Sequence, residues 1–517
     1  MSTSSEFQTF ASPALSESQR RRLREQIYKT FQNAATDGSL THWADVYIPE
    51  NHLQALDPRR MVVEGMRGTG KSFWTGVLTQ PLLREALQKQ PIGFDLKEAL
   101  AGIAESHAIA IDGGAGTAAG SFPNHSELPK LLQLEGVTPE TIWRVATLRL
   151  FPIDPALGLP LSNDPYDPWG LPIAWAGQHP ERLVRAIEML DLRWAATGKS
   201  ALVVFDAVDR VSHDLTEVER MAAGLLRFML DLRFAKGLRI KAFFREDVLT
   251  KAGASVVDGS KLLNQRAKLH WEQADLYGLA FYRLAQSSNY FRDQFKKLVG
   301  FTWKKDPWQR YQCDKASDPQ VQKMVWHALA GNYMGKTATR GYAYPYIFNH
   351  LSDGWGRVAP RAFLIALGEA AQSAERIYAD KPYVIYHEAI KDGVREASQA
   401  RVKELEEDYV WIAPALQCIK REQKTVPIDR TVLEAIWLQD DAEVLRQIEA
   451  LRDKALIPWR KDASNHEKID ALYNTLVGIG VLQSRLKNGN ERVELPDIYR
   501  LAYKIGRCGG ISTKKRP

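Results

Sequence analysis

Residues 65–72 read Gly65-Met66-Arg67-Gly68-Thr69-Gly70-Lys71-Ser72, which is the pattern GxxxxGK[ST] of a loop that binds phosphate groups. The apolar residues Met61-Val62-Val63 precede this loop and predict a strand, and a helix is expected to run from Gly70 toward Leu87. A strand, loop and helix in this order direct backbone amides and a helix N-terminus to one point, where anionic oxygens bind. We therefore expect the loop to bind the phosphates of ATP.

The residue types of this loop, called the P-loop below, have separate chemical tasks. Lys71 is expected to reach the β- and γ-phosphates, and Ser72 to give its hydroxyl to Mg²⁺. Glycine lacks the Cβ atom that would hold the backbone away from the phosphates. The residues expected to contact the nucleotide are Gly65, Arg67, Gly68, Thr69, Gly70, Lys71, Ser72 and Phe73. The alternative is a glycine-rich turn that binds no ligand.

A second glycine-rich stretch, residues 331–337, has three residues between its glycines where the pattern needs four. It follows an apolar, helix-like run at 321–330, and no buried strand precedes it. We predict that this stretch ends a helix and binds no phosphate.

Length and composition predict a globular protein of two or three domains. The chain has 517 residues, 45% of them hydrophobic and 25% charged, and no apolar run long enough to span a bilayer, so we expect no membrane contact. Residues 1–18 are rich in serine and lack the features of a signal peptide, so they predict a disordered tail of a cytoplasmic protein. The three cysteines and eleven histidines show no pairing or ligand spacing, which leaves Mg²⁺ as the expected metal.

The pattern along the chain predicts an ordered series of domains. After the tail we expect an N-terminal helix (19–42), a P-loop ATPase core (43–290), a helical lid (291–380), a helical linker region (381–465) and a winged-helix-like domain with a basic tail (466–517). The basic side of the first helix is expected to face solvent, with nucleic-acid contact as the alternative. Seven prolines at 152–180 predict an irregular insertion, either passive or a docking arm anchored by Trp169 and Trp175.

Strands and helices alternate within the predicted core. Strands are expected at 107–112, 201–205, 238–244 and 268–271, a mobile loop at 113–121, and helices at 138–148, 180–198, 216–236 and from about 276. The helix at 180–198 should turn Leu183, Val184, Ile187 and Leu190 inward, and Thr216 with Glu219 should form a capping box. The predicted fold is α/β, with a parallel sheet flanked by helices on both faces.

Acidic and basic residues follow two of these strands. Asp206 ends an apolar strand and is expected to hold Mg²⁺ together with Ser72, which suggests that the P-loop strand and the Asp206 strand are neighbours in the sheet. Most hydrolysing P-loop enzymes carry a second acid directly after the metal-binding Asp, where it polarises the attacking water. Here this position is Ala207, so Asp209 is the nearest substitute. Asp209 is expected either to approach the γ-phosphate or to pair with Arg210 on the surface. Arg245 ends the next strand and is a candidate sensor of the γ-phosphate.

Four motifs together resemble the bacterial STAND, KAP and origin-recognition-like branch of the AAA+ related P-loop ATPases. They are RGTGKS at 67–72, VVFDAVDR at 203–210, FFRED at 243–247 and APRAFL at 359–364, and the resemblance covers about residues 43 to 375. It implies that Asp206 binds Mg²⁺, that Arg245 acts as sensor 1 and that Arg361, in the lid, acts as sensor 2. Members of this branch often act in multi-protein systems, many of them antiphage defences, in which ATP assembles or switches a complex.

The C-terminal segment predicts a helix followed by a two-stranded wing. Ile469, Leu472, Leu476 and Ile479 form a helix face, and residues 481–486 and 492–495 flank the turn Asn488-Gly489. The last 52 residues carry ten Lys or Arg against five Asp or Glu, which is +5 of the net charge of +7. Arg485, Lys487, Arg492 and the tail Lys514-Lys515-Arg516 could therefore meet DNA phosphates. Protein docking is the alternative, and the charged helix at 398–409 is expected to be a hinge.

The leading hypothesis is an ATPase that switches its own oligomeric state or its contact with a protein effector. The alternatives are a scaffold that binds ATP without hydrolysing it, because Ala207 replaces an acid, and an origin-recognition-like loader that binds DNA. A small-molecule kinase normally has fewer residues beyond its core, which disfavours that interpretation.

Overall fold

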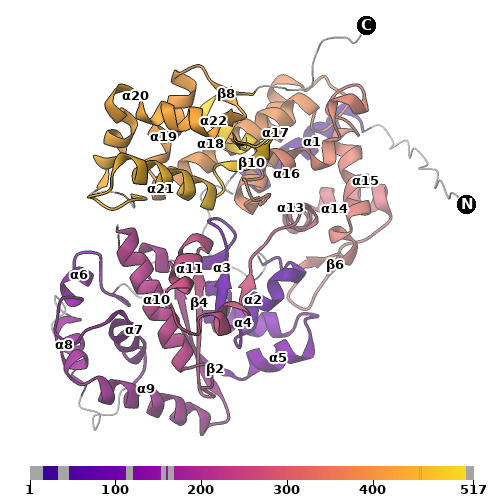
Figure 1. The fold of residues 1–517 in the computed structure, drawn as a ribbon. Coiled ribbons are helices and arrows are strands. Elements are labelled where there is room, and N and C mark those ends of the chain that lie inside the picture. The colour runs from indigo at the N-terminus through magenta and orange to yellow at the C-terminus, as the bar shows by residue number, and fades with distance from the viewer. Residues whose placement is uncertain are drawn as a thin grey trace, which may run out of the picture.

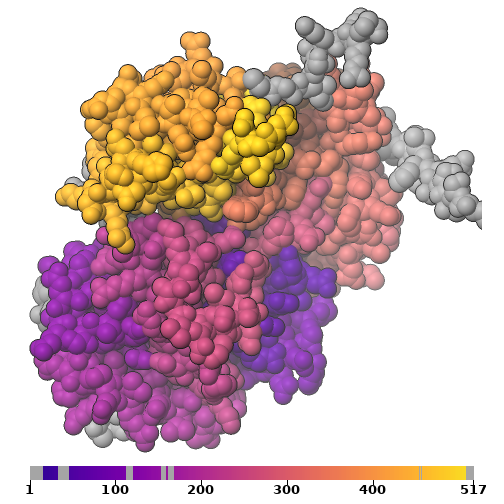
Figure 2. Space-filling model, viewed as in Figure 1, coloured from indigo at the N-terminus to yellow at the C-terminus, as the bar shows by residue number. Residues whose placement is uncertain are grey.

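The computed structural model describes residues 15–32, 43, 46–111, 120–152, 159–160, 168–212, 214–452, 455 and 457–507. The expected tail up to residue 14, most of the expected loop at 113–121 and the basic residues 514–516 lie outside these ranges. Figure 1 shows an α/β lobe, drawn from indigo to magenta, below a helical lobe drawn mainly in orange and yellow. The space-filling view in Figure 2 shows the two lobes in contact along their shared boundary.

A five-stranded parallel sheet forms the centre of the α/β lobe, in the order β2-β3-β4-β1-β5. The strands are β1 (Val62–Glu64), β2 (Ile103–Ala110), β3 (Ser200–Asp206), β4 (Leu238–Phe244) and β5 (Ala267–Lys268). The predicted α/β class and parallel sheet are confirmed. The expected contact between the P-loop strand and the Asp206 strand is wrong, because β4 lies between β1 and β3 and pairs with both.

Helices cover both faces of this sheet, as alternate residues of β3 show. Leu202 and Val204 enter one hydrophobic core, and Val203 and Phe205 enter the core on the opposite face. The first core is closed by α3 (Lys71–Thr79), α4 (Pro81–Gln88) and α5 (Phe94–Ala101). The second is closed by α6 (Leu128–Leu131), α7 (Pro139–Leu148), α8 (Gly170–Gln178), α9 (Pro180–Ala195), α10 (Leu215–Asp231), α11 (Glu246–Ala254) and α12 (Ser260–Leu263).

Several local predictions in this lobe need correction. The helix expected up to Leu87 is two helices, because Pro81 has no amide hydrogen to continue α3 and instead starts α4. The proline-rich stretch contains α8, and Trp169 is buried in the molecule's own core, so it anchors no docking arm. Val184 is exposed although it was expected to face inward. The cap of α10 is Asp214, whose carboxylate accepts from the Thr216 amide at 2.8 Å.

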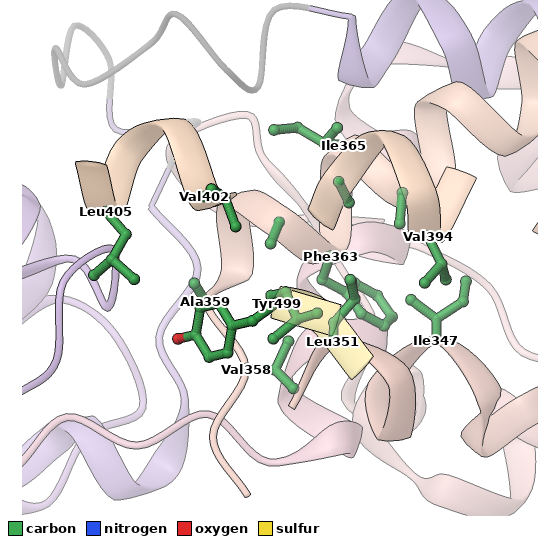
Figure 3. Packing of buried hydrophobic residues seen from close by; sticks show 14 of the residues in the cluster. Ile347, Leu351, Val358, Ala359, Phe363, Ile365, Val394, Val402, Leu405 and Tyr499 are labelled. Carbon is green, nitrogen blue, oxygen red and sulfur yellow. The ribbon is translucent and has the colours of Figure 1, made fainter. Parts of the chain in front are cut away.

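The helical lobe has one continuous hydrophobic core, to which Leu23, Ile27 and Phe31 contribute together with residues between Trp271 and Ile505. Its helices are α1 (Glu17–Phe31), α13 (Gln273–Ser287), α14 (Asn289–Val299), α15 (Pro319–Ala330), α16 (Ala343–Leu351), α17 (Pro360–Ile377), α18 (His387–Asp408), α19 (Ile412–Arg421), α20 (Arg430–Glu449, interrupted at 439–442), α21 (Asn465–Gly478) and α22 (Asp497–Tyr503). Figure 3 shows Val402 of α18, Phe363 of α17 and Tyr499 of α22 packed together. The segments expected to be lid, linker and C-terminal domain therefore share this core with the N-terminal helix.

The prediction that the basic side of α1 faces solvent holds for Arg21 and Arg22, which are exposed, and is wrong for Arg24. Arg24 is 1% exposed and donates to the carbonyls of Val384 at 2.7 Å and Tyr383 at 2.9 Å. Arg21 stays exposed. Arg24 thus attaches α1 to the segment before α18.

The predicted C-terminal hairpin is present and has a third strand. Strands β10 (Gln483–Lys487) and β11 (Asn490–Glu494) are antiparallel, and Asn488 and Gly489 have φ of 53° and 81° in the turn. Strand β9 (Ile428–Asp429) pairs with β11, so this unit begins before residue 466. The other short elements are η2 (Glu50–His52), α2 (Leu53–Leu56), η4 (Val208–Arg210), β6 (Lys304–Lys305), β7 (Tyr311–Gln312), η5 (Asp314–Ser317), η6 (Ala338–Arg340), β8 (Thr425–Val426) and β12 (Gly506–Arg507).

The second glycine-rich stretch ends a helix, as predicted, because Gly331 caps α15 with φ of 80°. Among the described residues, no helix is both long and apolar enough to cross a membrane.

Candidate nucleotide-binding site

A pocket of about 390 Å³ lies at the carboxyl ends of β1, β3 and β4, where the two lobes meet. Ligands of open α/β sheets bind at this edge. All but one of the site residues predicted from the sequence line the pocket. Those that line it are Arg67, Gly68, Thr69, Gly70, Lys71, Ser72, Phe73, Asp206, Asp209, Arg245 and Arg361. Gly65, at the start of the P-loop, is the exception.

The P-loop conformation depends on its glycines. Gly68 and Gly70 have φ of 80° and 100°, in the left-handed region that favours glycine. A Cβ atom on Gly65 would lie 2.6 Å from the Thr69 hydroxyl oxygen, which is too close for two non-bonded atoms. Thr69 supports the loop from within, because its hydroxyl donates to the Met66 carbonyl at 2.8 Å and its carbonyl accepts from the Trp271 indole at 3.0 Å.

Lys71 lies against the base of the P-loop. Its ammonium group donates to the carbonyls of Gly65 and Met66, both at 3.0 Å. Burial lowers the pKa of Lys71, although the nearby carboxylates of Asp209 and Asp206 act in the opposite direction. The anionic oxygens of a phosphate chain would therefore favour the charged form of Lys71.

Ser72 and Asp206 form the pair suited to a magnesium ion. Asp206 is 3% exposed, and burial raises its pKa while a hydrogen bond with Ser72 opposes this shift. A hydroxyl and a carboxylate are oxygen donors of the kind that Mg²⁺ prefers, so the residues present fit this ion. Within the described ranges, no group of three or more His, Cys, Asp or Glu side chains could hold a metal. Substrate phosphates and water would supply the remaining ligands of Mg²⁺.

Arg245 lies at the end of β4 and is surrounded by carboxylates. Its guanidinium is 2.7 Å from Asp247, 3.3 Å from Asp209 and 3.7 Å from Asp408. Burial alone would lower the pKa of Arg245, but Asp247 and Asp209 raise it above its ordinary value. The ring of Tyr409 lies 4.8 Å from this cation, and its hydroxyl donates to Asp247 at 2.9 Å.

A backbone turn at Ala207 directs Asp209 into the pocket. Ala207 has φ of 57°, a left-handed conformation that costs a residue other than glycine about 1–2 kcal/mol. The turn leaves the Asp209 side chain 11% exposed and beside Arg245. Of the two placements expected for Asp209, the structure therefore shows the one inside the site, and among the described residues its ion-pair partner is Arg245, not Arg210.

The carboxyl end of α18 forms one wall of the site, which the sequence did not predict. Arg67 of the P-loop pairs with Glu407 at 2.5 Å and with Asp408. Arg361, expected to reach the nucleotide from the lid, pairs with Glu404 at 3.0 Å. The charged composition of residues 398–409 was visible in the sequence, but composition gives no partner for these acids.

Apolar and aromatic side chains also line the pocket. They are Tyr47, Trp271, Leu279, Pro360 and Leu364. The ring of Tyr47 is stacked on that of Trp271, with centroids 6.3 Å apart and planes at 23°. The lining thus combines charged and aromatic residues, and no sequence motif indicated the aromatic ones.

Comparisons with known proteins give little beyond this geometry. A scan against protein-family models found no match, and a search of curated proteins found none. Among solved structures, the chain is similar to the Aeropyrum pernix ORC2 protein in its ADPNP–ADP complexes, with 12% sequence identity and a TM-score of 0.36. The alignment covers 96% of this chain and 94% of that chain.

Proposed function

We propose that this chain is an ATPase that acts as a molecular switch. The observation that carries the proposal is the convergence of Lys71, the Ser72–Asp206 pair and Arg245 on one pocket, from the ends of three strands. Phosphoryl transfer needs cations around the β- and γ-phosphates, ligands for Mg²⁺ and a group that positions water. The pocket offers residues for each of these tasks.

The residues divide the work by position. Lys71 and the P-loop amides would hold the phosphates, and Ser72 and Asp206 would hold Mg²⁺, which would neutralise developing negative charge. Arg245 contacts the γ-phosphate and Arg361 approaches from α17. The stacked rings of Tyr47 and Trp271 offer an apolar surface to a nucleobase.

Hydrolysis requires a base for the attacking water, and Asp209 is the carboxylate in position. Its carboxylate lies 3.3 Å from the guanidinium of Arg245. Because this contact holds the carboxylate away from a water molecule, we expect slow hydrolysis that speeds up when Arg245 turns toward a phosphate.

The same ion pair favours a second candidate function, a scaffold that binds ATP without hydrolysing it. Ala207 supplies no acid next to Asp206, and Asp209 is engaged. In that case ATP would stabilise the assembled form by mass action alone.

The output of the switch is proposed to be a change in a protein complex. The helical lobe contacts the pocket through α17 and α18, so nucleotide state can reach the C-terminal hairpin. Partners are a homo-oligomer, a protein effector, or DNA at the basic residues Arg485, Lys487 and Arg492. The family resemblance extends this proposal to defence against phages.

The test is ATP binding and phosphate release by the purified chain, with and without DNA. Lys71→Ala, Asp206→Ala and Asp209→Ala are compared with Lys89→Ala, which removes an exposed lysine paired with Glu85 on α4. Loss of turnover in the three site variants, with Lys89→Ala unchanged, supports the switch. ATP binding without turnover in the wild type supports the scaffold, and no ATP binding in the wild type refutes both.

A further inference from the structure

The carboxyl end of α18 places three acids on three arginines of the pocket. Glu404 pairs with Arg361 and Glu407 with Arg67, at 3.0 and 2.5 Å. Asp408 contacts two arginines, because one carboxylate oxygen pairs with Arg67 and the other lies 3.7 Å from Arg245. A single carboxylate thus bridges the P-loop to the end of β4.

This placement has a local cost that the arginines offset. The carboxyl end of a helix carries a partial negative charge, which disfavours acidic side chains there. The last turn of α18 nevertheless contains no basic residue and ends in Glu406-Glu407-Asp408. Since the last turn has no basic residue, the favourable partners of Glu406, Glu407 and Asp408 come from outside it. Arg67 and Arg245 lie in the other lobe, and Tyr503 donates to Glu406 at 2.7 Å.

Asp408 contacts two of the cations that line the candidate phosphate site. Asp408, Arg67 and Arg245 line the same pocket as Lys71 and Asp206. The γ-phosphate is the anionic group that separates a nucleoside triphosphate from a diphosphate. Two anions competing for the same guanidinium groups repel each other, and the repulsion is strong in a partly buried site.

We propose that Asp408 determines how the site distinguishes tri- from diphosphates. Its carboxylate stays on Arg67 and Arg245 when the site is empty or holds ADP, and the γ-phosphate of ATP displaces it. ATP then releases the end of α18 from the P-loop, whereas ADP leaves it attached. The inference rests on the proposed function, because it requires a nucleotide in this pocket.

The end of α18 is either attached to the P-loop or released from it. A ligand shifts this equilibrium only by the difference in its affinity for the two states. ATP and ADP differ in this respect because only ATP has the γ-phosphate that competes with Asp408. α18 packs along α17 and contacts α22, so release of its end can be transmitted to the helical lobe. Figure 3 shows Leu405, three residues before Asp408, at the end of α18 that lies beside the ribbon of the α/β lobe.

The first experiment compares the affinities of the full-length protein for ADP and for the non-hydrolysable analogue AMP-PNP. Asp408→Asn removes the competing charge, and Glu396→Gln removes an exposed carboxylate from the same helix. In Asp408→Asn we expect AMP-PNP to bind ~10-fold more tightly and ADP to change less than ~2-fold, because only the triphosphate must displace the helix. The ratio of the two affinities should not change in Glu396→Gln.

The outcomes separate this inference from the function on which it rests. If the wild type binds neither nucleotide, the proposed function fails. If the wild type binds both nucleotides and Asp408→Asn leaves the ratio of the AMP-PNP and ADP affinities unchanged, the inference about Asp408 fails while the proposed function stands.

A second measurement uses only the wild type, so it does not depend on how the variant folds. Amide hydrogen exchange of residues 401–409 should be faster with AMP-PNP than with ADP, because the released helix end loses its partners. Equal exchange with the two nucleotides, or protection by AMP-PNP, would overturn the proposal.

Discussion

The guanidinium of Arg245 lies 3.3 Å from the carboxylate of Asp209, at the end of the strand that separates the P-loop strand from the Asp206 strand. The cation expected to sense the γ-phosphate and the acid expected to activate water are thus partners of each other. Any motion of Arg245 toward a ligand changes the charge felt by Asp209.

This relationship predicts the kinetic effect of Asp209→Asn. We expect kcat for ATP hydrolysis to fall ~100-fold with KM nearly unchanged, because a general base acts in the transition state and adds little to ground-state binding. Steady-state phosphate release checks this, with Asp258→Asn, an exposed acid paired with Lys261, as control. A large rise in KM with unchanged kcat would assign Asp209 to binding.

Gly68→Ala is predicted to weaken nucleotide binding. Gly68 has φ of 80°, and an added Cβ would lie 3.3 Å from the Cβ of Ala359, so the loop must shift. We expect ATP affinity to fall ~10-fold, which corresponds to a loss of about 1.4 kcal/mol in binding free energy. Fluorescence titration with a labelled nucleotide measures this affinity.

Gly93→Ala is the matched control, since Gly93 has a negative φ and no atom within 4 Å of an added Cβ. Equal losses in both variants would mean that the P-loop backbone is not the cause.

Arg24→Met is predicted to destabilise the helical lobe. The substitution leaves the carbonyls of Val384 and Tyr383 without their buried donor. We expect the free energy of unfolding to fall by about 3 kcal/mol, as for other broken buried charge contacts. Urea denaturation measures this change.

Arg21→Met provides the comparison, because Arg21 pairs with the same Glu375 but is 77% exposed. Its effect should stay below ~0.5 kcal/mol. A comparable loss in both variants would contradict the assignment of the stabilisation to the buried contacts.

Asp497 is predicted to give the helical lobe a pH-dependent stability. Burial would raise its pKa, but the hydrogen bond from His350 at 2.6 Å and the charge of Arg500 lower it to about 2. A carboxyl with a lowered folded-state pKa stabilises the fold above its unfolded-state pKa, and this stabilisation is lost as the pH falls toward 2.

Asp497→Asn should therefore reduce the free energy of unfolding by about 2 kcal/mol at pH 7, and the difference from wild type should shrink as the pH falls from 4 toward 2. Denaturation across this range checks it, with Asp380→Asn, 70% exposed, as control. A difference that does not depend on pH would refute the electrostatic explanation.

The parts of the fold that the sequence predicted are those with local or periodic signals. The spacing of glycines and lysine located the P-loop, and the unbroken apolar run of β3 indicated a buried parallel strand. The helix expected at 138–148 is α7, and Thr138 caps it. Each of these signals acts within a few residues, so no knowledge of distant segments was needed.

What the sequence could not show depends on partners far along the chain. The order β3-β4-β1 depends on how the helical connections between the strands pack on the sheet, so it cannot be predicted from the sequence of any single strand. Arg67 and Glu407 are 340 positions apart, and a charged residue does not identify which opposite charge it will meet. The sequence also gives no sign that Arg24 is buried, because its acceptors are backbone carbonyls of a distant segment and every residue type has such a carbonyl.

The attachment of α1 also has a consequence for the order of events during protein synthesis. Arg24 and its acceptor Val384 are 360 residues apart, so α1 leaves the ribosome long before its binding surface exists. At the usual ~5–20 residues per second, this helix waits roughly 20–70 seconds while the whole α/β lobe is made. The α/β lobe can fold in that time, and α1, the first helix in the described part of the chain, is among the last elements to pack.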